Sequence, residues 1–388
     1  MRRVYLDNNA TTPVLPEVFE AMKPFYLERF GNASSIHHYG QHARAAVEKA
    51  RAAVAALMHC RPAEVVFTSG GTEGDNAGIF GLVSKGDHVI TSTIEHSAVL
   101  NTCKRLEQMG CEVTNVGVNE RGEIDPEDIR KALRPNTRLI SVMMANNETG
   151  VLQPVEEIGR IAREADVFFH TDAVQAAGKV PIDVEKIGCD VLSISGHKIH
   201  APQGTGAMYI RKGTLIQPLI YGGSHERQRR AGTENLPGIV GLGKAAELAT
   251  EWLSGNGPAE MSAMRDHLQQ SVLDTVEAAG VNGASAARVP NTTNLWFDYI
   301  EGEALVIALD LKGLAVSSGA ACSSGAIEPS HVLLAMGLLH ERARASVRIS
   351  LGKQTTQEDV DFAISVIPET VGRLREISPL YAKQAISS

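Results

Sequence analysis

The chain has 388 residues, of which 43% are hydrophobic and 21% are charged, the composition of an ordinary globular protein. This length exceeds what one hydrophobic core usually supports, so we expect two domains. A formal net charge of −8 excludes nucleic acid as the main partner, because phosphate binding needs a concentrated basic surface.

Short apolar runs alternate with helical patterns from about residue 40 to residue 210. This alternation predicts an α/β fold with a mostly parallel sheet sandwiched by helices. A helix is expected over Ala43–Leu57, which is rich in alanine, and another near Pro154, because a first helical turn tolerates proline. The predicted strands are 64–69, 88–93, 111–116, 138–145, 167–172, 191–195 and 206–211.

A domain boundary is expected at 254–258, where a long helical pattern ends in turn-forming residues. Beyond it the pattern is helix, strand (293–300), helix, strand, helix, strand (346–351) and a terminal helix. This order predicts a smaller α+β domain. We therefore assign residues 15–257 to a large domain, and residues 1–14 and 258–388 to a small one that carries the loop around Cys322.

A glycine-rich turn, Ser69–Asn76, follows one predicted strand and opens a helix. Free backbone N–H groups at a helix start can cradle a phosphate, and the hydroxyl of Thr72 would add a donor. The pattern is not specific on its own, because such turns are common between a strand and a helix.

Asp172 and Lys198 each stand at or just after the end of a predicted buried strand. A pyridoxal phosphate enzyme needs a lysine for its Schiff base and a carboxylate that keeps the pyridine nitrogen protonated. His96 and Asn147 also follow strands, and α/β sheets bind ligands at the carboxyl ends of their parallel strands. We therefore expect these four side chains to converge around such a cofactor.

A loop of small residues, Val316–Gly325, contains Cys322. An accessible thiol in such a loop can act as a nucleophile, and an inert buried thiol is the alternative. Arg348 lies inside a β pattern, where its guanidinium could clamp a substrate carboxylate or form a structural ion pair.

Two other motifs point to sites that we do not expect. Segment 238–245 has P-loop spacing, but Ala245 replaces the hydroxyl residue that would hold magnesium, so a helix is predicted there. His38 and His42 have zinc-site spacing, but Tyr39 stands where a zinc protease has glutamate.

The sequence gives no sign of membrane insertion or export. Arg2 and Arg3 are followed by Asp7 before an apolar stretch develops, so the start does not resemble a secretory signal. The longest run without charge has 15 residues, 313–327, too few to span a bilayer. Five cysteines without a C-x-x-C pair favour a reducing compartment, so we expect a cytoplasmic protein.

Taken together, these residues resemble the cysteine desulfurases of the class V aminotransferase family, in the group of nitrogenase-associated and housekeeping iron-sulfur enzymes. The resemblance implies the type I fold of pyridoxal phosphate-dependent transferases. It extends over almost the whole chain. The segments that carry it are 5–13, 31–37, 69–76, 146–150, 169–175, 193–198, 230–235 and 316–331.

The resemblance assigns roles around the cofactor ring. Lys198 would form the Schiff base, Asp172 would contact the ring nitrogen, and Gln175 the ring hydroxyl. His96 would stack on the ring and transfer protons, and Asn147 would also contact the cofactor. The phosphate would be held by Gly71, Thr72, Ser195 and His197.

The resemblance further implies a homodimer in which Thr233 reaches the phosphate of the second subunit. Asn147 and Arg348 would bind the carboxylate of L-cysteine. Cys322 would take the sulfur as a persulfide, releasing L-alanine, and pass it to an iron-sulfur scaffold protein or another acceptor. Whether Cys322 transiently ligates an iron-sulfur cluster stays open. Transamination, selenocysteine cleavage and a catalytically silent scaffold are the alternatives.

Overall fold

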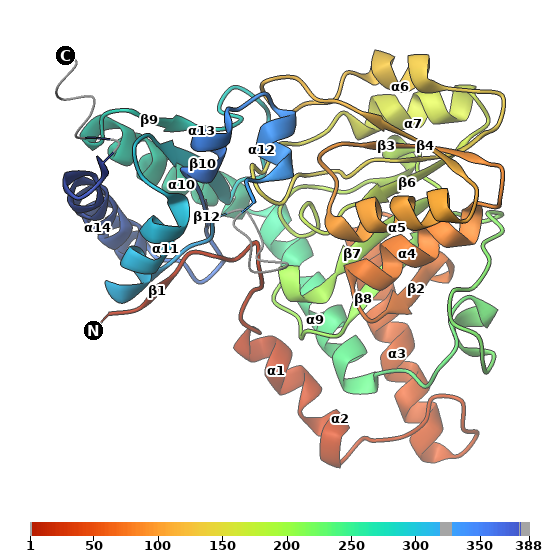
Figure 1. The fold of residues 1–388 in the computed structure, drawn as a ribbon. Coiled ribbons are helices and arrows are strands. Elements are labelled where there is room, and N and C mark those ends of the chain that lie inside the picture. Colours follow the sequence, from red (N-terminus) through yellow and green to blue (C-terminus); the bar gives the residue numbers. More distant parts are fainter. Residues whose placement is uncertain (1, 319–327, 380, 382–388) are drawn as a thin grey trace.

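A computed structural model describes residues 2–318, 328–379 and 381. Its larger part is built on a seven-stranded sheet of order β2-β8-β7-β6-β5-β3-β4 (Figure 1). β8 runs antiparallel to both neighbours, and the other adjacent strands are parallel, so the predicted mostly parallel sheet is confirmed. The strands are Val65–Thr68 (β2), His88–Ser92 (β3), Glu112–Val116 (β4), Thr137–Ser141 (β5), Phe168–Asp172 (β6), Val191–Ser195 (β7) and Gly206–Ile210 (β8).

One predicted strand, 138–145, was too long. β5 ends at Ser141, and the chain then runs on beside β6 through two backbone hydrogen bonds, from Val142 N to His170 O (3.1 Å) and from Met144 N to Asp172 O (2.8 Å). Val142 and Met144 lie beyond the regular β5–β6 ladder, at the carboxyl ends of the two strands. The other six strands of this sheet agree with the prediction to within one residue at each end, which is the ordinary uncertainty of strand limits.

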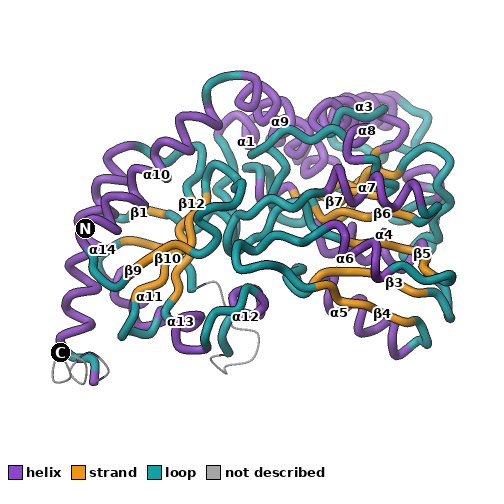
Figure 2. Tube along the Cα trace, turned by 90° about the horizontal axis from the view of Figure 1, so that it is seen from above, coloured by secondary structure: helices purple, strands orange, loops and turns teal. Residues whose placement is uncertain are grey.

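Helices cover both faces of the sheet, because its strands are apolar on both sides. β2, for example, places Val65 and Phe67 in the core on one face and Val66 in the core on the other. The first core includes residues of α3, α7 and α9, and the second includes residues of α4 and α5 (Figure 2). The helices of this part are Pro16–Met22 (α1), Pro24–Leu27 (α2), His38–Leu57 (α3), Gly71–Leu82 (α4), Ser97–Gln108 (α5), Pro126–Ala132 (α6), Val155–Glu164 (α7), Val184–Ile187 (α8) and Leu236–Ser254 (α9).

Two helices begin elsewhere than expected. α3 starts at His38, five residues before the predicted start, because the Nδ1 atom of His37 caps it by accepting from Gly40 N (3.3 Å). Pro154 lies just before α7 rather than inside its first turn. The segment with P-loop spacing lies inside α9, as predicted.

The smaller part contains a three-stranded antiparallel sheet of order β12-β10-β9 and a two-stranded parallel pair, β1 and β11. β9 is an additional strand that the sequence pattern did not predict. None of the helices among the described residues is long and apolar enough to cross a membrane. The elements are Val4–Tyr5 (β1), Gly257–Thr275 (α10), Ala279–Val281 (β9), Thr292–Phe297 (β10), Gly302–Leu311 (α11), Leu314–Ala315 (β11), His331–Ala335 (α12), His340–Arg344 (α13), Ser346–Ser350 (β12) and Gln357–Glu376 (α14).

A separate hydrophobic core fills the smaller part. Val4 and Leu6, from the start of the chain, belong to this core together with residues of β10, β12 and α14. Trp252, near the end of α9, packs against it from the larger part. The division into 15–257 and 1–14 with 258–388 stays a prediction, and it is supported by the core of the smaller part, which is separate from the two cores that flank the large sheet.

Candidate active site

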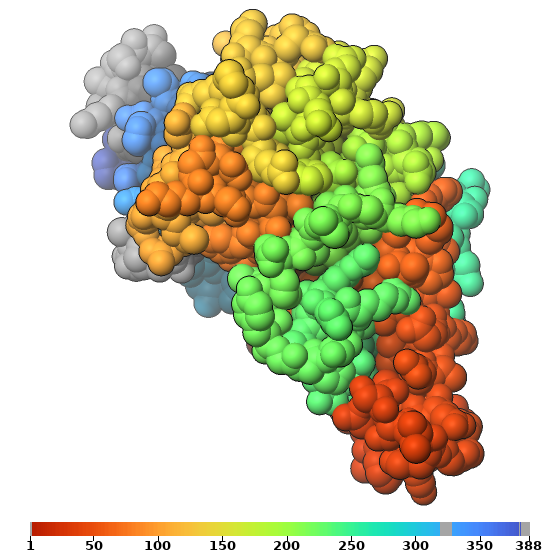
Figure 3. All heavy atoms as spheres, turned by 90° about the vertical axis from the view of Figure 1, so that its right-hand side faces the viewer, coloured from red at the N-terminus to blue at the C-terminus, as the bar shows by residue number. Residues whose placement is uncertain are grey.

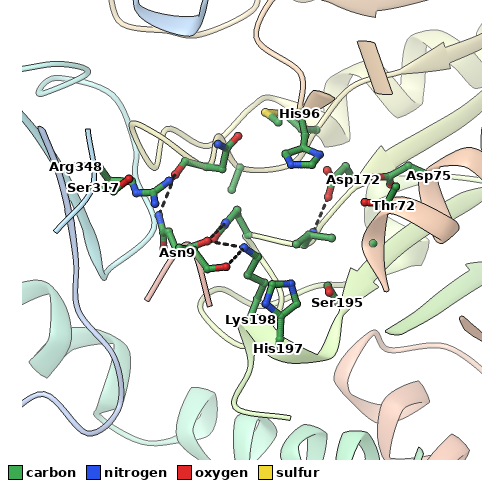
Figure 4. A pocket seen from close by; sticks show the side chains of 17 residues that line it. Asn9, Thr72, Asp75, His96, Asp172, Ser195, His197, Lys198, Ser317 and Arg348 are labelled. Carbon is green, nitrogen blue, oxygen red and sulfur yellow. Dashed lines mark hydrogen bonds between the residues drawn. The ribbon is translucent and has the colours of Figure 1, made fainter. Parts of the chain in front are cut away.

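A cavity of about 400 Å³ lies between the carboxyl edge of the parallel strands and the smaller part of the chain (Figure 4). Strand ends supply several of its residues, as the edge of a parallel sheet commonly does. The structure brings together most of the predicted site residues at its wall: Gly71, Thr72, His96, Asn147, Asp172, Gln175, Ser195, His197, Lys198 and Arg348.

Lys198 lies in a short 3-10 turn, Gly196–Lys198, directly after β7. Its Nζ atom donates hydrogen bonds to the carbonyl oxygens of Asn9 (2.6 Å) and Ala10 (2.7 Å). Burial and the nearby Arg348 guanidinium lower the pKa of this amine to about 8, against the opposite effect of Asp172. A primary amine with such a pKa is partly neutral near physiological pH and can act as a nucleophile or a base.

Asp172 is the last residue of β6 and is almost fully buried. Its Oδ1 atom accepts a hydrogen bond from Val174 N (2.8 Å), and among the described residues no group donates to Oδ2. Burial and the nearby carboxyl of Asp75 raise the pKa of Asp172 to about 7, while His96 acts in the opposite direction. A cationic nitrogen placed beside this carboxyl would favour its charged form.

His96 is the N-cap residue of α5, and its Nδ1 atom accepts a hydrogen bond from Ala98 N (3.1 Å). Burial lowers the pKa of the ring, against the opposite effect of Asp172. Since Nδ1 is an acceptor, the neutral ring carries its proton on Nε2. Figure 4 shows the ring on the opposite side of the cavity from Lys198.

The start of α4 is a candidate anion cradle. No side chain caps this helix, and Gly71 and Thr72 line the cavity. A Cβ atom at Gly71 would come within 2.6 Å of Val174 Cγ2, so only glycine lets the helix start approach this closely. Burial and Lys198 lower the pKa of His197 to about 4, so its ring is neutral and would bind an anion by hydrogen bonding rather than by charge.

Arg348, from β12, reaches the cavity from the smaller part of the chain. Its Nη2 atom forms an ion pair with Asp7 Oδ1 (2.7 Å), and Nη1 donates to the carbonyl oxygen of Asn147 (3.0 Å). Its Nε atom is buried without an acceptor among the described residues. The guanidinium therefore forms a structural ion pair, one of the two interpretations of the sequence, and its Nε–H could still donate to a ligand.

Several groups of this cavity were not predicted from the sequence. Asn9 and Ala10 fix the lysine amine, yet the motif at 5–13 was noted without a role. Asp75 is buried, and its Oδ1 atom has no hydrogen-bond donor among the described residues; it lies 3.4 Å from His170 Nε2. The only signal for Asp75 was an acidic residue at an inward position of a glycine-rich helix start.

Of the predicted site residues that the structure describes, Thr233 does not line the cavity, and its side chain is exposed. Cys322 lies outside the described residues. The chain before it passes the cavity at Ser317, which pairs with Arg348 through two backbone hydrogen bonds. The chain after it is fixed where Ser330 donates to Glu148 Oε2.

No group of three or more histidine, cysteine, aspartate or glutamate side chains suited to a metal occurs in the part of the chain that the structure describes. His38 and His42 do lie on one face of α3, with ring centroids 4.2 Å apart, and both are exposed.

These features fit pyridoxal 5′-phosphate. The uncapped start of α4 suits the phosphate, and the free Oδ2 atom of Asp172 suits a protonated ring nitrogen. Lys198 lies at the same cavity with an amine of lowered pKa. The cavity thus offers an acceptor, a candidate anion cradle and a lysine amine that could form a Schiff base.

Comparisons with known proteins agree with this geometry. Residues 4–362 match the aminotransferase class-V family. Cysteine desulfurase IscS of Dictyoglomus turgidum is 49% identical over 383 residues, covering 97% of each chain. A solved structure described as a NifS-like protein has a TM-score of 0.88 and 40% identity, and covers 96% of this chain and 100% of that chain. Another, described as SspA in complex with cysteine, has a TM-score of 0.81 and 38% identity, and covers 91% and 100%. The chain therefore belongs to the pyridoxal phosphate-dependent aminotransferase class-V family and, within it, to the cysteine desulfurases.

Proposed function

We propose that this chain removes sulfur from L-cysteine, releases L-alanine and carries the sulfur as a persulfide on Cys322. The observation that carries the proposal is the single cavity in which Lys198, Asp172 and His96 meet. Relatives named cysteine desulfurase, and the related structure described as a complex with cysteine, support the choice of substrate.

Bound pyridoxal phosphate supplies an electron sink for negative charge that develops at the Cα atom of the substrate. Asp172 would hold the proton of the ring nitrogen through Oδ2 and so maintain this sink. Lys198 Nζ, once released from the cofactor by the substrate, would take the Cα proton, and its lowered pKa makes the neutral amine available. His96 Nε2 would carry protons on the opposite side of the cavity.

Arg348 and Asn147 would orient the substrate. The guanidinium of Arg348 is fixed by Asp7 and by the carbonyl oxygen of Asn147, while its buried Nε–H finds no acceptor among the described residues. A substrate carboxylate would supply the missing acceptor, and a charge-assisted hydrogen bond of this kind is strong. Ser317, which precedes the segment with Cys322 in the sequence, lines the same cavity.

Cys322 would act as the nucleophile in the sulfur transfer. Its thiolate attacks the sulfur of the substrate, so an S–S bond forms while the C–S bond breaks. The electron pair of the broken bond goes to carbon, which is protonated and leaves as alanine. The resulting persulfide would pass to a scaffold protein of iron-sulfur assembly or to another sulfur acceptor in the cytoplasm. The described cysteines 60, 103, 111 and 189 form no disulfide, which suits that compartment.

A homodimer would place Thr233 at the phosphate of the partner site. The loop that carries Thr233 is held by Arg230, which pairs with Glu73 (2.9 Å) in the first turn of α4, and by the buried pair of Arg51 and Glu226 (2.7 Å). Figure 3 shows this segment (green) beside the N-terminal helices (red). Exposed apolar side chains accompany both segments, which suits an interface: Phe19, Tyr26, Leu27, Phe30, Tyr39, Leu215, Leu219, Ile220 and Tyr221.

The experiment measures alanine released from L-cysteine by the cofactor-loaded protein under reductant. We compare the wild type with Cys322→Ala and, as a control, with Cys60→Ala, because burial raises the pKa of the Cys60 thiol to about 12 and makes it unreactive. We expect wild-type and Cys60→Ala proteins to release alanine, and Cys322→Ala almost none.

Each alternative gives a different result in the same assay. Equal release by Cys322→Ala would remove Cys322 as the nucleophile. No alanine from any of the three proteins would overturn desulfuration and favour transamination or a silent scaffold. A strong preference for selenocysteine over cysteine would identify a selenocysteine-directed enzyme.

A further inference from the structure

Lys179 is a buried lysine without an acidic partner. Its side chain follows β6 by seven residues, is 7% exposed and has no carboxylate within ion-pair distance among the described residues. Its Nζ atom donates hydrogen bonds to Gln175 Oε1 (2.6 Å) and Asn9 Oδ1 (3.2 Å). Burial, Lys198 and Arg348 lower its pKa well below 10.5. Burying an amine without an acidic partner lowers the stability of the fold, so a local function would explain why Lys179 is present.

Both partners of Lys179 line the cavity described above. Gln175 Nε2 donates to the carbonyl oxygen of Asn9 (2.9 Å), and the same oxygen accepts from Lys198 Nζ (2.6 Å). Lys179 is therefore connected to Lys198 through Asn9, which contacts both lysines, and it also contacts Gln175.

The contact fixes which end of the Gln175 amide faces which neighbour. With Oε1 directed at Lys179 and Nε2 at the oxygen of Asn9, the amide keeps one N–H to offer to the cavity. If the amide were reversed, Nε2 would face the donor Nζ of Lys179, and Oε1 would face the carbonyl oxygen of Asn9. Neither contact would then be a hydrogen bond. Without Lys179, the Oε1 atom would be buried without a donor, and turning this oxygen towards the cavity would relieve that cost.

We propose that Lys179 is a positioning residue, which holds Gln175 and Asn9 so that an amide N–H faces the ring oxygen of the cofactor and a carbonyl oxygen faces Lys198. This inference rests on the proposed cofactor site and deepens it. Lys179 itself touches neither the cofactor nor the substrate.

The test is a pH titration of the absorption of the bound cofactor, which depends on the charge of the ring oxygen and does not require turnover. A donor to that oxygen stabilises the more negative, deprotonated state. We expect Lys179→Met to move the midpoint upward by about one to two pH units, the size expected for the loss of one hydrogen bond to a charged group. Lys186→Met, a substitution of a mostly exposed lysine, should leave the midpoint unchanged.

A double-mutant cycle separates positioning from a general structural effect. In the Gln175→Ala background, Lys179→Met should add no further shift, because the amide through which Lys179 acts is absent. Equal shifts in both backgrounds, or an unchanged midpoint in the single variant, would overturn the inference. Should Lys179→Met fail to fold in a thermal unfolding assay, Lys179→Ala carries the same expectations. A wild-type protein that binds no cofactor would instead contradict the proposed function.

Discussion

The surroundings of Lys198 lower the pKa of its amine. This residue is half-buried, and Arg348 adds a repulsive charge, whereas Asp172 and Asp7 favour the ammonium form. The first two influences prevail, so the pKa of the amine falls to about 8. The two carbonyl oxygens of Asn9 and Ala10 hold the amine in place in either protonation state.

The lowered pKa predicts how the reactivity of Lys198 depends on pH in the cofactor-free protein. The folded state disfavours the ammonium, so the reactive neutral amine should appear as the pH rises through about 8 rather than near 10.5. Labelling with a small amine reagent, followed by peptide mass analysis, measures the midpoint for this residue. Lys186 supplies an exposed reference in the same sample. A midpoint for Lys198 that coincides with the reference would contradict this electrostatic account.

At the level of elements, glycine residues allow helices to pack closely against adjacent strands and helices. A Cβ atom at Gly74 of α4 would lie 2.8 Å from Ser193 Oγ in β7, and one at Gly78 would lie 2.9 Å from Val191 Cγ1. α4 can therefore press against the sheet, which brings its start to the cavity. Gly159 of α7 has a similar role, because a Cβ atom there would overlap the main-chain oxygen of Ile187 at the end of α8.

The contact at Gly159 predicts opposite effects of the same substitution in two helices. Gly159→Ala must displace backbone, so we expect it to lower the free energy of unfolding by about 1–3 kcal/mol. Gly372→Ala, at an exposed position of α14 where a Cβ atom meets nothing within 4 Å, should raise it by about 0.5–1 kcal/mol. Denaturant unfolding of the two cofactor-loaded variants measures both. A Gly159→Ala protein as stable as Gly372→Ala would contradict the packing described for α7.

In the molecule as a whole, both parts of the chain contribute residues to the cavity. β12 of the smaller part supplies Arg348, while the strands of the larger part supply Asp172 and the turn with Lys198. Thr233 is outside its own cavity, which is consistent with a site completed by a second copy of the chain.

Mixed dimers test whether Thr233 acts across the interface. Lys198→Ala inactivates the site of its own chain but still offers Thr233, whereas Thr233→Ala keeps Lys198. A dimer of one chain of each kind then contains one site with both residues intact, so mixing the two weakly active variants under exchange conditions should restore alanine formation. Unmixed variants are the controls. If Thr233 serves its own chain, mixing will restore nothing.

Local sequence patterns were enough to predict most of the elements and the α/β character of the fold, because hydrophobic periodicity and turn residues act over a few neighbours. The sequence also predicted that Asp172, Lys198 and His96 converge, since each stands at or shortly after a strand end, and all three line one cavity. Errors fell where local patterns end, as at 142–145, where the chain leaves the ladder but keeps pairing with β6.

The pairing of polar groups that are distant in the sequence became visible only in the folded chain. The contacts of Asn9 with Gln175, Lys179 and Lys198, and that of Asp7 with Arg348, join the first residues of the chain to segments far along it. Such pairs leave no periodic trace in the sequence, because they depend on how the two parts close around the cavity. Burial then shifts the pKa of the titratable groups among them, such as Lys198, and so determines which of them can act as a nucleophile or a base.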